Sequence, residues 1–207
     1  MGLLKHKLIA TLLLAVTALG PWGGTAASQS RLDPNAVIER SEAAIGQLVG
    51  SYILTDSKGA LLDMASFRGR PLVISLIYTS CGTVCPTTTQ HLLDAVREAR
   101  RVMGEDAFAV LTIGFDARRD TPSRLNSFAR TQGIDAKDWQ LASADLLTIE
   151  ALLDDLGFSY YAAAGGFDHI TQATILDADG RVFRQVYGDT FPDQIFIEPL
   201  KALVFGT

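Results

Sequence analysis

The sequence is poor in cysteine and has no block of like charge. It contains two cysteines, Cys81 and Cys85, so no third thiol competes for a disulfide or for a soft metal ion. The net charge of -5 is mildly acidic, and no run of Lys or Arg forms a basic arm, which argues against a nucleic-acid-binding surface. Repeats and low-complexity segments are absent, and Met64 and Met103 are isolated, so there is no methionine-rich metal motif.

The N-terminal residues differ in composition from the rest of the chain. Lys5 and Lys7 are followed by a continuous apolar run over residues 8–19, and small residues at 25–27 suit cleavage by a peptidase. The run is shorter than the roughly 20 apolar residues that a membrane-spanning helix needs. We therefore expect a secretory signal peptide, with an uncleaved membrane anchor as the alternative.

This interpretation divides the chain into three segments. Residues 1–27 are the expected signal peptide, residues 28–48 a linker with a short helix after Asp33-Pro34, and residues 49–207 a single domain. The protein is expected to be exported to the periplasm, either free or tethered to the outer face of the inner membrane. In an oxidising compartment a lone cysteine pair is most often a structural disulfide, so any other role needs local evidence.

Strand and helix patterns alternate through the middle of the chain. The apolar run over residues 72–78 is typical of a strand buried on both faces of a parallel sheet, and a helical pattern starts at Pro86. Residues 107–115 form a second such run, and helices are predicted to begin at Pro122 and after Asp145. This alternation predicts the α/β class.

The last third of the chain has a different pattern. Residues 171–177 and 181–187 read as strands joined across Asp179-Gly180, a strong hairpin signal, and a closing helix is expected after Pro192. Another hairpin is predicted around residues 51–62. The order of elements predicts a thioredoxin-like fold with an extra N-terminal β-hairpin and an inserted strand-helix unit.

Both cysteines follow the first long buried strand, at the sheet edge where open α/β folds place their chemistry. On a helix, the spacing of Cys81 and Cys85 puts both sulfurs on one face, and the N–H groups at the helix start stabilise thiolate. Two thiolates favour Cu(I), with zinc as the usual competitor, and an imidazole would complete a three-coordinate site. A structural disulfide over so short a loop would constrain little of the unfolded chain, which weakens that alternative.

The sequence offers few histidines as a third ligand. His6 lies in the expected signal peptide. His91 follows Cys85 by six residues, a rotation of about 240° on a helix, so it is expected on the surface and away from the cysteines. His169 stands before a hairpin strand, where the thioredoxin plan packs a loop against the cysteine loop. Asp168 is expected to orient its ring by a hydrogen bond behind the metal ligand.

Three motifs resemble the Sco/SenC family of copper-handling proteins, and the resemblance covers residues 49–204. They are Tyr78-Thr79-Ser80-Cys81-x-x-x-Cys85-Pro86, Asp116-Ala117-Arg118-Arg119-Asp120-Thr121-Pro122, and Asp168-His169. Gly82 and Thr83 stand where the family usually has a proline and an acidic residue, and Ala117 replaces a usual proline.

The resemblance implies a copper ion, as Cu(I) or Cu(II), bound by Cys81, Cys85 and His169. It also implies a partner, subunit II of cytochrome c oxidase, whose binuclear copper A centre the family helps to assemble. Residues 116–122 are also explained as a turn and a helix cap. The aromatic residues of the last third that lie near His169 in sequence are expected to rim the site or to belong to the core: Phe158, Tyr160, Tyr161 and Phe167.

Two functions compete for the cysteine pair. In the first, a metallochaperone passes copper to subunit II or another acceptor by ligand exchange, and no enzymatic catalysis is required. In the second, a thiol-disulfide oxidoreductase or redox sensor uses a redox-active Cys81–Cys85 disulfide and a thiol reductant partner. The metallochaperone needs His169 as a copper ligand, whereas the oxidoreductase needs only the two cysteines. A peroxidase of thioredoxin fold is a third hypothesis, which the C-x-x-x-C spacing argues against.

Overall fold

The computed structural model describes residues 33–134 and 139–206. The predicted signal peptide and the beginning of the predicted linker lie outside the described residues. The predicted linker helix is present as α1 (Pro34–Ala43), whose first turn is capped by the side chain of Asp33. None of the described helices has the length and apolar character to cross a membrane.

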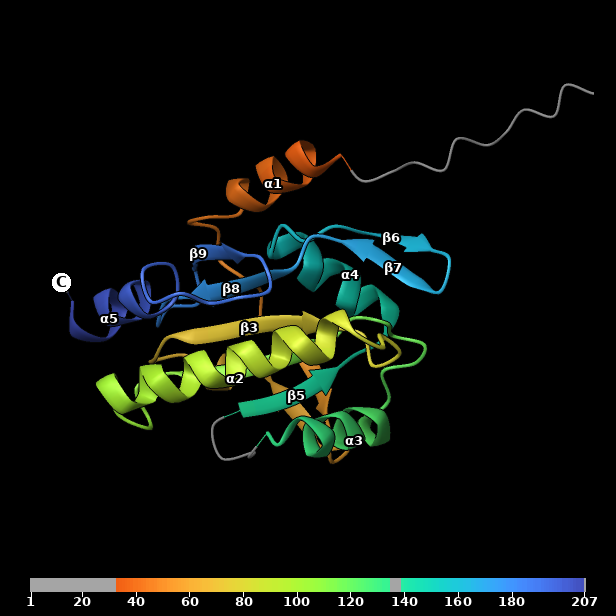
Figure 1. The fold of residues 1–207 in the computed structure, drawn as a ribbon, viewed down its shortest axis with the longest axis horizontal. Coiled ribbons are helices and arrows are strands. Elements are labelled where there is room, and N and C mark those ends of the chain that lie inside the picture. The colour runs from red at the N-terminus through yellow and green to blue at the C-terminus, as the bar shows by residue number, and fades with distance from the viewer. Residues whose placement is uncertain (1–32, 135–138, 207) are drawn as a thin grey trace, which may run out of the picture. The chain divides into compact units, whose positions relative to one another are not determined.

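A mixed seven-stranded sheet lies at the centre of the fold (Figure 1). Strands β3, β4 and β5 are parallel, and the other pairs are antiparallel. The order across the sheet is β2 (Leu61–Asp63), β1 (Ile53–Asp56), β5 (Trp139–Ser143), β4 (Ala109–Gly114), β3 (Leu72–Ile77), β8 (Gln172–Leu176) and β9 (Val182–Tyr187). The apolar runs that predicted β3 and β4 are buried along nearly their whole length, as expected for central parallel strands.

The helices pack around this sheet. α2 (Val84–Met103) turns the side chains of Leu92, Leu93 and Val96 into the core and contacts α3 (Pro122–Gln132) and α5 (Ile197–Phe205). α4 (Leu146–Asp155) is joined to α1 by the Arg40–Asp154 ion pair, whose nitrogen and oxygen are 2.5 Å apart. Asp145 caps α4 by accepting a hydrogen bond from the Thr148 N–H, as predicted.

The predicted thioredoxin-like fold is confirmed. β3, α2 and β4 form the parallel half, and the β8–β9 hairpin and α5 close the fold. β1 and β2 form the extra N-terminal hairpin, and α3 with β5 is the inserted unit. Two details differ from the sequence prediction. α2 begins at Val84, before Pro86, and the chain adds a separate hairpin of β6 (Tyr160–Ala163) and β7 (Gly166–His169) that the sequence did not predict.

Candidate metal centre

The two cysteines lie at the carboxyl end of β3, as predicted. Cys81 is in the loop after the strand, half-buried, and Cys85 is buried in the first turn of α2. The Cys85 N–H donates a hydrogen bond to Cys81 Sγ, with a nitrogen-to-sulfur distance of 3.3 Å. Both are free thiols in this structure. The start of α2 therefore presents a backbone donor directly to the first cysteine.

The surroundings give the two thiols different acidities. Burial by itself raises the pKa of Cys81, but the N–H groups of Cys85 and Thr83, together with hydrogen bonds from the Cys85 and Tyr78 side chains, outweigh burial and lower it. Burial raises the pKa of Cys85 to about 12, and the negative charges of Cys81 and Asp120 act in the same direction. In the reduced pair, Cys81 is therefore the more acidic thiol, and the Cys85 side chain is hydrogen-bonded to it.

Tyr78 connects the cysteine loop to the β6–β7 hairpin. Its side chain is hydrogen-bonded to Cys81, and it also interacts with the backbone of Phe167 in β7. The hairpin approaches so closely that a Cβ atom on Gly166 would lie 2.7 Å from the Tyr78 hydroxyl oxygen. Glycine at this position is therefore what permits the contact between Tyr78 and β7.

His169 is the last residue of β7 and packs among aromatic rings. Its ring centroid lies 6.0 Å from that of Tyr78 and 5.5 Å from that of Phe115. Burial lowers the pKa of His169, and its contact with the Ile170 carbonyl and the charge of Asp168 oppose burial only in part. His169 Nδ1 is 3.1 Å from the Ile170 carbonyl oxygen, which can only accept, so Nδ1 carries the proton and Nε2 keeps its lone pair. The ring is neutral, the form that binds a metal.

Two of the three predicted ligands share one cavity. Cys85 and His169 both line a narrow cavity of about 20 Å³ between β3, α2 and β8, together with Thr88, Thr89 and Phe191. Cys81 does not line this cavity, although its sulfur is hydrogen-bonded to Cys85. Within the described ranges, no three His, Cys, Asp or Glu side chains are placed to hold a metal ion together. The structure thus brings the predicted ligands to one edge of the sheet without closing a three-ligand site.

The model of the SCO1/SenC family matches residues 40–204. The chain belongs to the SCO1/SenC family. It is 27% identical over 128 residues to "Protein SCO2 homolog, mitochondrial" of Bos taurus, covering 61% of this chain and 47% of that protein. It is 23% identical over 209 residues to the SCO2-like protein of Rickettsia felis, covering 94% of each.

Solved structures share the fold of this SCO1/SenC protein. The structure of Bradyrhizobium japonicum ScoI with copper bound superposes with a TM-score of 0.62 at 22% identity, covering 75% of this chain and 99% of that one. The chain spans about half the length of the first mammalian relatives, 47% of the bovine and 54% of the human protein. The match of the family model to residues 40–204 confirms the predicted family membership.

One expectation for a side chain near the site of this SCO1/SenC protein is corrected by the structure. Asp168 is exposed, and the partner of His169 Nδ1 is the Ile170 carbonyl, so Asp168 acts on the ring only through its charge. Because the carbonyl of the next residue lies close enough to accept this hydrogen bond, no side-chain acceptor is needed. His91 lies at the surface and does not line the cysteine cavity, as predicted, and its Nδ1 lies 2.6 Å from the Asp189 carbonyl oxygen, which joins α2 to the loop after β9.

Asp120 is a structural part of the site that the sequence analysis explained only as part of a turn and cap. Its carboxylate accepts hydrogen bonds from the Thr79 N–H and hydroxyl, at 2.8 and 2.7 Å, and from the Asp116 N–H at 2.9 Å. It therefore fixes the start of the cysteine loop to the end of β4. The sequence does mark this residue, because Asp120 belongs to the second SCO1/SenC motif. The cap interpretation also holds, because Thr121 accepts a hydrogen bond from the Arg124 N–H.

The aromatic residues divide between the two roles expected for them. Phe158 is buried with its ring centroid 5.5 Å from that of His169, while Phe167 is half-buried and lies 5.2 Å from Tyr78. Tyr160 contacts Phe115 at 5.1 Å, and Tyr161 is exposed. Phe158, Tyr160 and Phe167 thus belong to one aromatic cluster around Phe115, in which Phe158 contacts the imidazole directly. Burial of the imidazole in this cluster lowers its pKa.

Proposed function

We propose that this SCO1/SenC protein is a copper metallochaperone, with Cys81, Cys85 and His169 as its copper ligands. Its acceptor is the copper A centre of subunit II of cytochrome c oxidase, to which it delivers copper or whose thiols it prepares. The observation that carries the proposal is the cavity lined by both Cys85 and neutral His169, next to Cys81, the more acidic of the two thiols.

The proposed ligand atoms suit copper as the metal that the protein carries. Two sulfurs and one imidazole nitrogen form a soft set that favours Cu(I) over hard divalent cations. The family resemblance and the copper-bound state of Bradyrhizobium japonicum ScoI support copper as the metal. Because the three side chains are not closed around one point in this structure, loading requires the β6–β7 hairpin or the cysteine loop to move.

Each ligand has a distinct task in loading. Cys81 is the more acidic thiol, so it loses its proton more readily and binds the incoming ion first. Cys85 has a pKa of about 12, so it must release its proton when its sulfur becomes a ligand. His169 offers the lone pair of Nε2 without losing a proton, because its Nδ1–H is held by the Ile170 carbonyl. Release to an acceptor reverses these steps as the acceptor's thiolates replace Cys81 and Cys85 one at a time.

The proposal places the protein outside the cytoplasm. The N-terminal apolar run and the small residues after it support export to the periplasm, with tethering to the outer face of the inner membrane if the segment stays uncleaved. The partners are subunit II or another copper acceptor, and a thiol reductant that keeps the cysteine pair reduced in an oxidising compartment.

Copper titration of the reduced protein, followed by X-ray absorption spectroscopy, tests the ligand set. We expect a site of two sulfurs and one nitrogen. Replacing His169 by alanine should weaken copper binding at least about tenfold, since even residues behind metal ligands contribute that much. His91→Ala is the matched control, because it removes the other histidine of the domain. Equal copper affinity of His169→Ala and the unsubstituted protein would refute the three-ligand assignment.

A thiol-disulfide oxidoreductase is the second candidate, and the split acidity of the two cysteines favours it. The Cys81 thiolate would attack a sulfur of a partner disulfide and expel one partner thiolate. Cys85, once deprotonated, would attack the Cys81 sulfur of the mixed disulfide and release the second partner thiolate. The pair is oxidised by two electrons and the partner is reduced. This activity predicts an unchanged dithiol reduction potential in His169→Ala, whereas the chaperone model predicts a loss of copper binding.

A further inference from the structure

Strand β9 forms one outer edge of the seven-stranded sheet, far in the strand order from the inserted β5–α3 unit. Every second residue of an antiparallel edge strand directs its backbone N–H and C=O groups away from the sheet. At the start of β9 these groups are used, because the Val182 N–H donates to Gln47 and the Val182 carbonyl accepts from Gly46. Over residues 183–187 the outer edge pairs with no described strand.

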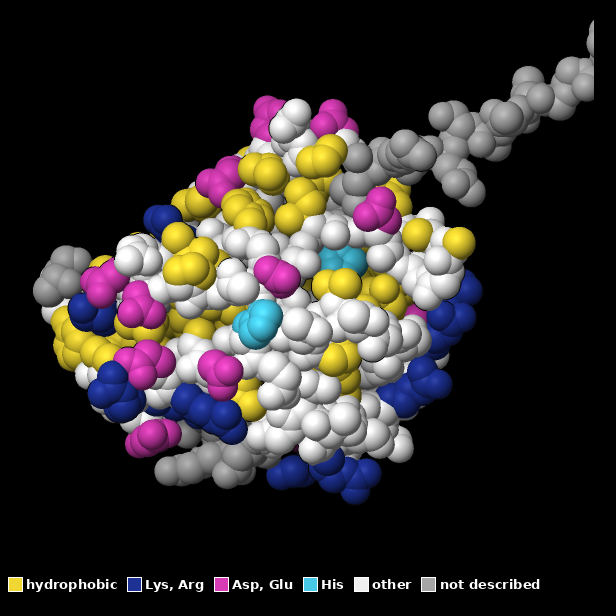
Figure 2. Space-filling model, viewed as in Figure 1, with side chains coloured by type: hydrophobic (Ala, Val, Ile, Leu, Met, Phe, Trp, Pro, Cys, Tyr) yellow, Lys and Arg dark blue, Asp and Glu magenta, His cyan; other side chains and the backbone are white. Residues whose placement is uncertain are grey.

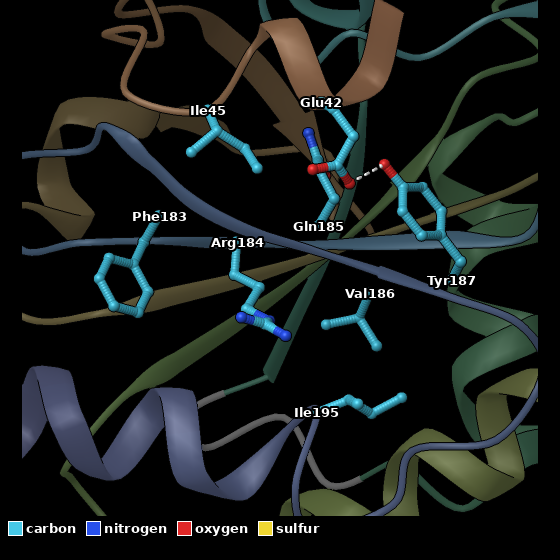
Figure 3. Close-up of a pocket in the computed structure, with 8 residues that line it drawn as sticks. All are labelled: Glu42, Ile45, Phe183, Arg184, Gln185, Val186, Tyr187 and Ile195. Atoms are coloured by element: carbon cyan, nitrogen blue, oxygen red, sulfur yellow. Dashed lines mark hydrogen bonds between the residues drawn. The ribbon is translucent and has the colours of Figure 1, made fainter. Parts of the chain in front are cut away.

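A groove of about 370 Å³ runs along this free edge (Figure 3). One wall comes from the end of α1, with Glu42, and from the turn after it, with Ile45. The other wall contains Ile195, which precedes α5. Ile45 is 43% exposed and Phe183, at one end of the groove, is 39% exposed. Apolar side chains also gather on the surface over α1 and α5 (Figure 2). Along the edge itself Phe183 and Arg184 are exposed and Tyr187 is half-buried, while the side chains of Gln185 and Val186 are buried beneath the groove.

Charge is distributed unevenly across the groove. Arg184 and Val186 lie on the face of β9 toward Ile195, while Gln185 and Tyr187 lie toward α1, as Figure 3 shows. Glu42 is already engaged, because it accepts a hydrogen bond from the Tyr187 hydroxyl at 2.7 Å. Arg184 makes no ion pair or side-chain hydrogen bond with any described residue. On the face toward Ile195, the Arg184 side chain thus has no charged partner among residues 33–134 and 139–206, and it lies beside the strand edge that pairs with no described strand.

We propose that the free edge of β9 is a docking site for an extended segment of a partner protein, which adds to the sheet as an eighth strand. Its backbone would pair with residues 183–187. Its side chains would alternate, with an acidic residue placed toward Arg184 and apolar residues toward Ile45 and Phe183. This surface lies apart from the proposed copper ligands, so the inference goes beyond the proposed function.

Charge argues against two other occupants. Residues 1–32 of this chain contain no Asp or Glu, so they offer nothing to pair with Arg184. Pairing of β9 with β9 of a second copy would place two Arg184 side chains on the same face of the joined sheet, because opposing residues of an antiparallel pair share a face. A strand from another protein that alternates acidic and apolar residues can pair with Arg184 and brings no second arginine to the same face.

Binding of short synthetic peptides to the full reduced protein tests this proposal. The probe is a fluorescent peptide of alternating valine and glutamate, and the matched probe has lysine in place of glutamate. We expect the glutamate peptide to bind at least about tenfold more tightly. Amide signals of residues 183–187 should shift in nuclear magnetic resonance spectra. Two further peptides carry N-methyl groups on the odd or on the even peptide nitrogens. Only the peptide whose methylated nitrogens face β9 should lose binding, because methylation removes those hydrogen-bond donors.

Variants of Arg184 separate edge pairing from general attraction. Arg184→Glu should reverse the preference between the two peptides, and Arg184→Gln should weaken only the glutamate peptide. Arg124→Glu changes an exposed arginine on α3, beside β5, and should leave both affinities unchanged. Equal binding of the two peptides, no saturable binding, or signal shifts that leave β9 unaffected would each overturn the proposal. A dimer would also overturn the proposal if the amide signals of β9 shift at high protein concentration and return on dilution. The edge would then bind a second copy of this chain.

Discussion

The ring of Tyr78 lies edge-to-face against the imidazole of His169, with 6.0 Å between the ring centroids. The same tyrosine is hydrogen-bonded through its side chain to Cys81 and interacts with the Phe167 backbone. One buried side chain therefore contacts both halves of the proposed copper site. The charge of Cys81 and the position of the hairpin that carries His169 are linked through this residue.

Removing the Tyr78 hydroxyl should make Cys81 less acidic. Tyr78→Phe keeps the ring in the aromatic cluster but deletes a donor to the Cys81 thiolate. A hydrogen bond to a charged group is worth about 1.5 kcal/mol, so the pH midpoint of Cys81 alkylation should rise by about one unit. The rate of alkylation by iodoacetamide, measured against pH in a Cys85→Ser background, gives this midpoint. An unchanged midpoint would show that the hydroxyl does not stabilise the thiolate.

The two cysteines should react at very different rates at neutral pH. Cys81 is half-buried with a lowered pKa, whereas burial raises the pKa of Cys85 to about 12 and leaves it 4% exposed. Limited alkylation of the reduced protein, followed by peptide mass spectrometry, should therefore label Cys81 first. Cys85 should be labelled at a comparable rate only after unfolding in urea, which serves as the control. Equal labelling of both residues in the folded protein would contradict this difference in acidity and exposure.

Burial of His169 should make the folded state lose stability as the pH falls. Its pKa is lowered by folding, so the folded protein binds a proton less readily than the unfolded chain. The stabilisation is fully present above the unfolded pKa of about 6.5 and is lost as the pH falls through the lower folded pKa. His169→Phe fits the same aromatic cluster and should flatten this part of the curve of unfolding free energy against pH. Identical curves for the two proteins would show that folding does not change the protonation of His169.

The parts of the site that could be predicted from sequence are those fixed by local pattern. The apolar run of β3, the C-x-x-x-C spacing and the hairpin at Asp179-Gly180 are each set by neighbouring residues, and the structure has them as predicted. The β6–β7 hairpin was missed because β6 is half-buried only at Tyr160 and exposed along the rest of its length, so it lacks the alternation that marks a strand.

Other features of the site depend on contacts between distant segments. Asp120 reaches Thr79 only because β3 and β4 are adjacent and parallel. The contact of Tyr78 with β7 depends on where the hairpin folds back, which no local pattern specifies. The placement of Cys85 and His169 around one cavity is of the same kind: the family motifs indicated the residues, and the packing decides how near they come.

The close approach of β7 to Tyr78 should make Gly166 and Tyr78 energetically coupled. A Cβ atom on Gly166 would lie 2.7 Å from the Tyr78 hydroxyl oxygen and 2.9 Å from a ring carbon, so Gly166→Ala must displace the hairpin or the ring. We expect a loss of about 1–3 kcal/mol in unfolding free energy, the usual cost of overpacking. Urea unfolding measures this loss, and copper titration shows whether the displaced hairpin still delivers His169.

The neighbouring glycine supplies the control for this coupling. Gly165 has a φ of +90° and nothing within 4 Å of an added Cβ, so Gly165→Ala should cost about 1 kcal/mol through backbone strain alone. In a double-mutant cycle with Tyr78→Phe, the cost of Gly166→Ala should fall, because the nearest atom is gone, whereas the cost of Gly165→Ala should stay the same. Additive costs for Gly166→Ala and Tyr78→Phe would mean that the hairpin and the cysteine loop are positioned independently, and Tyr78 would no longer explain how they are held together.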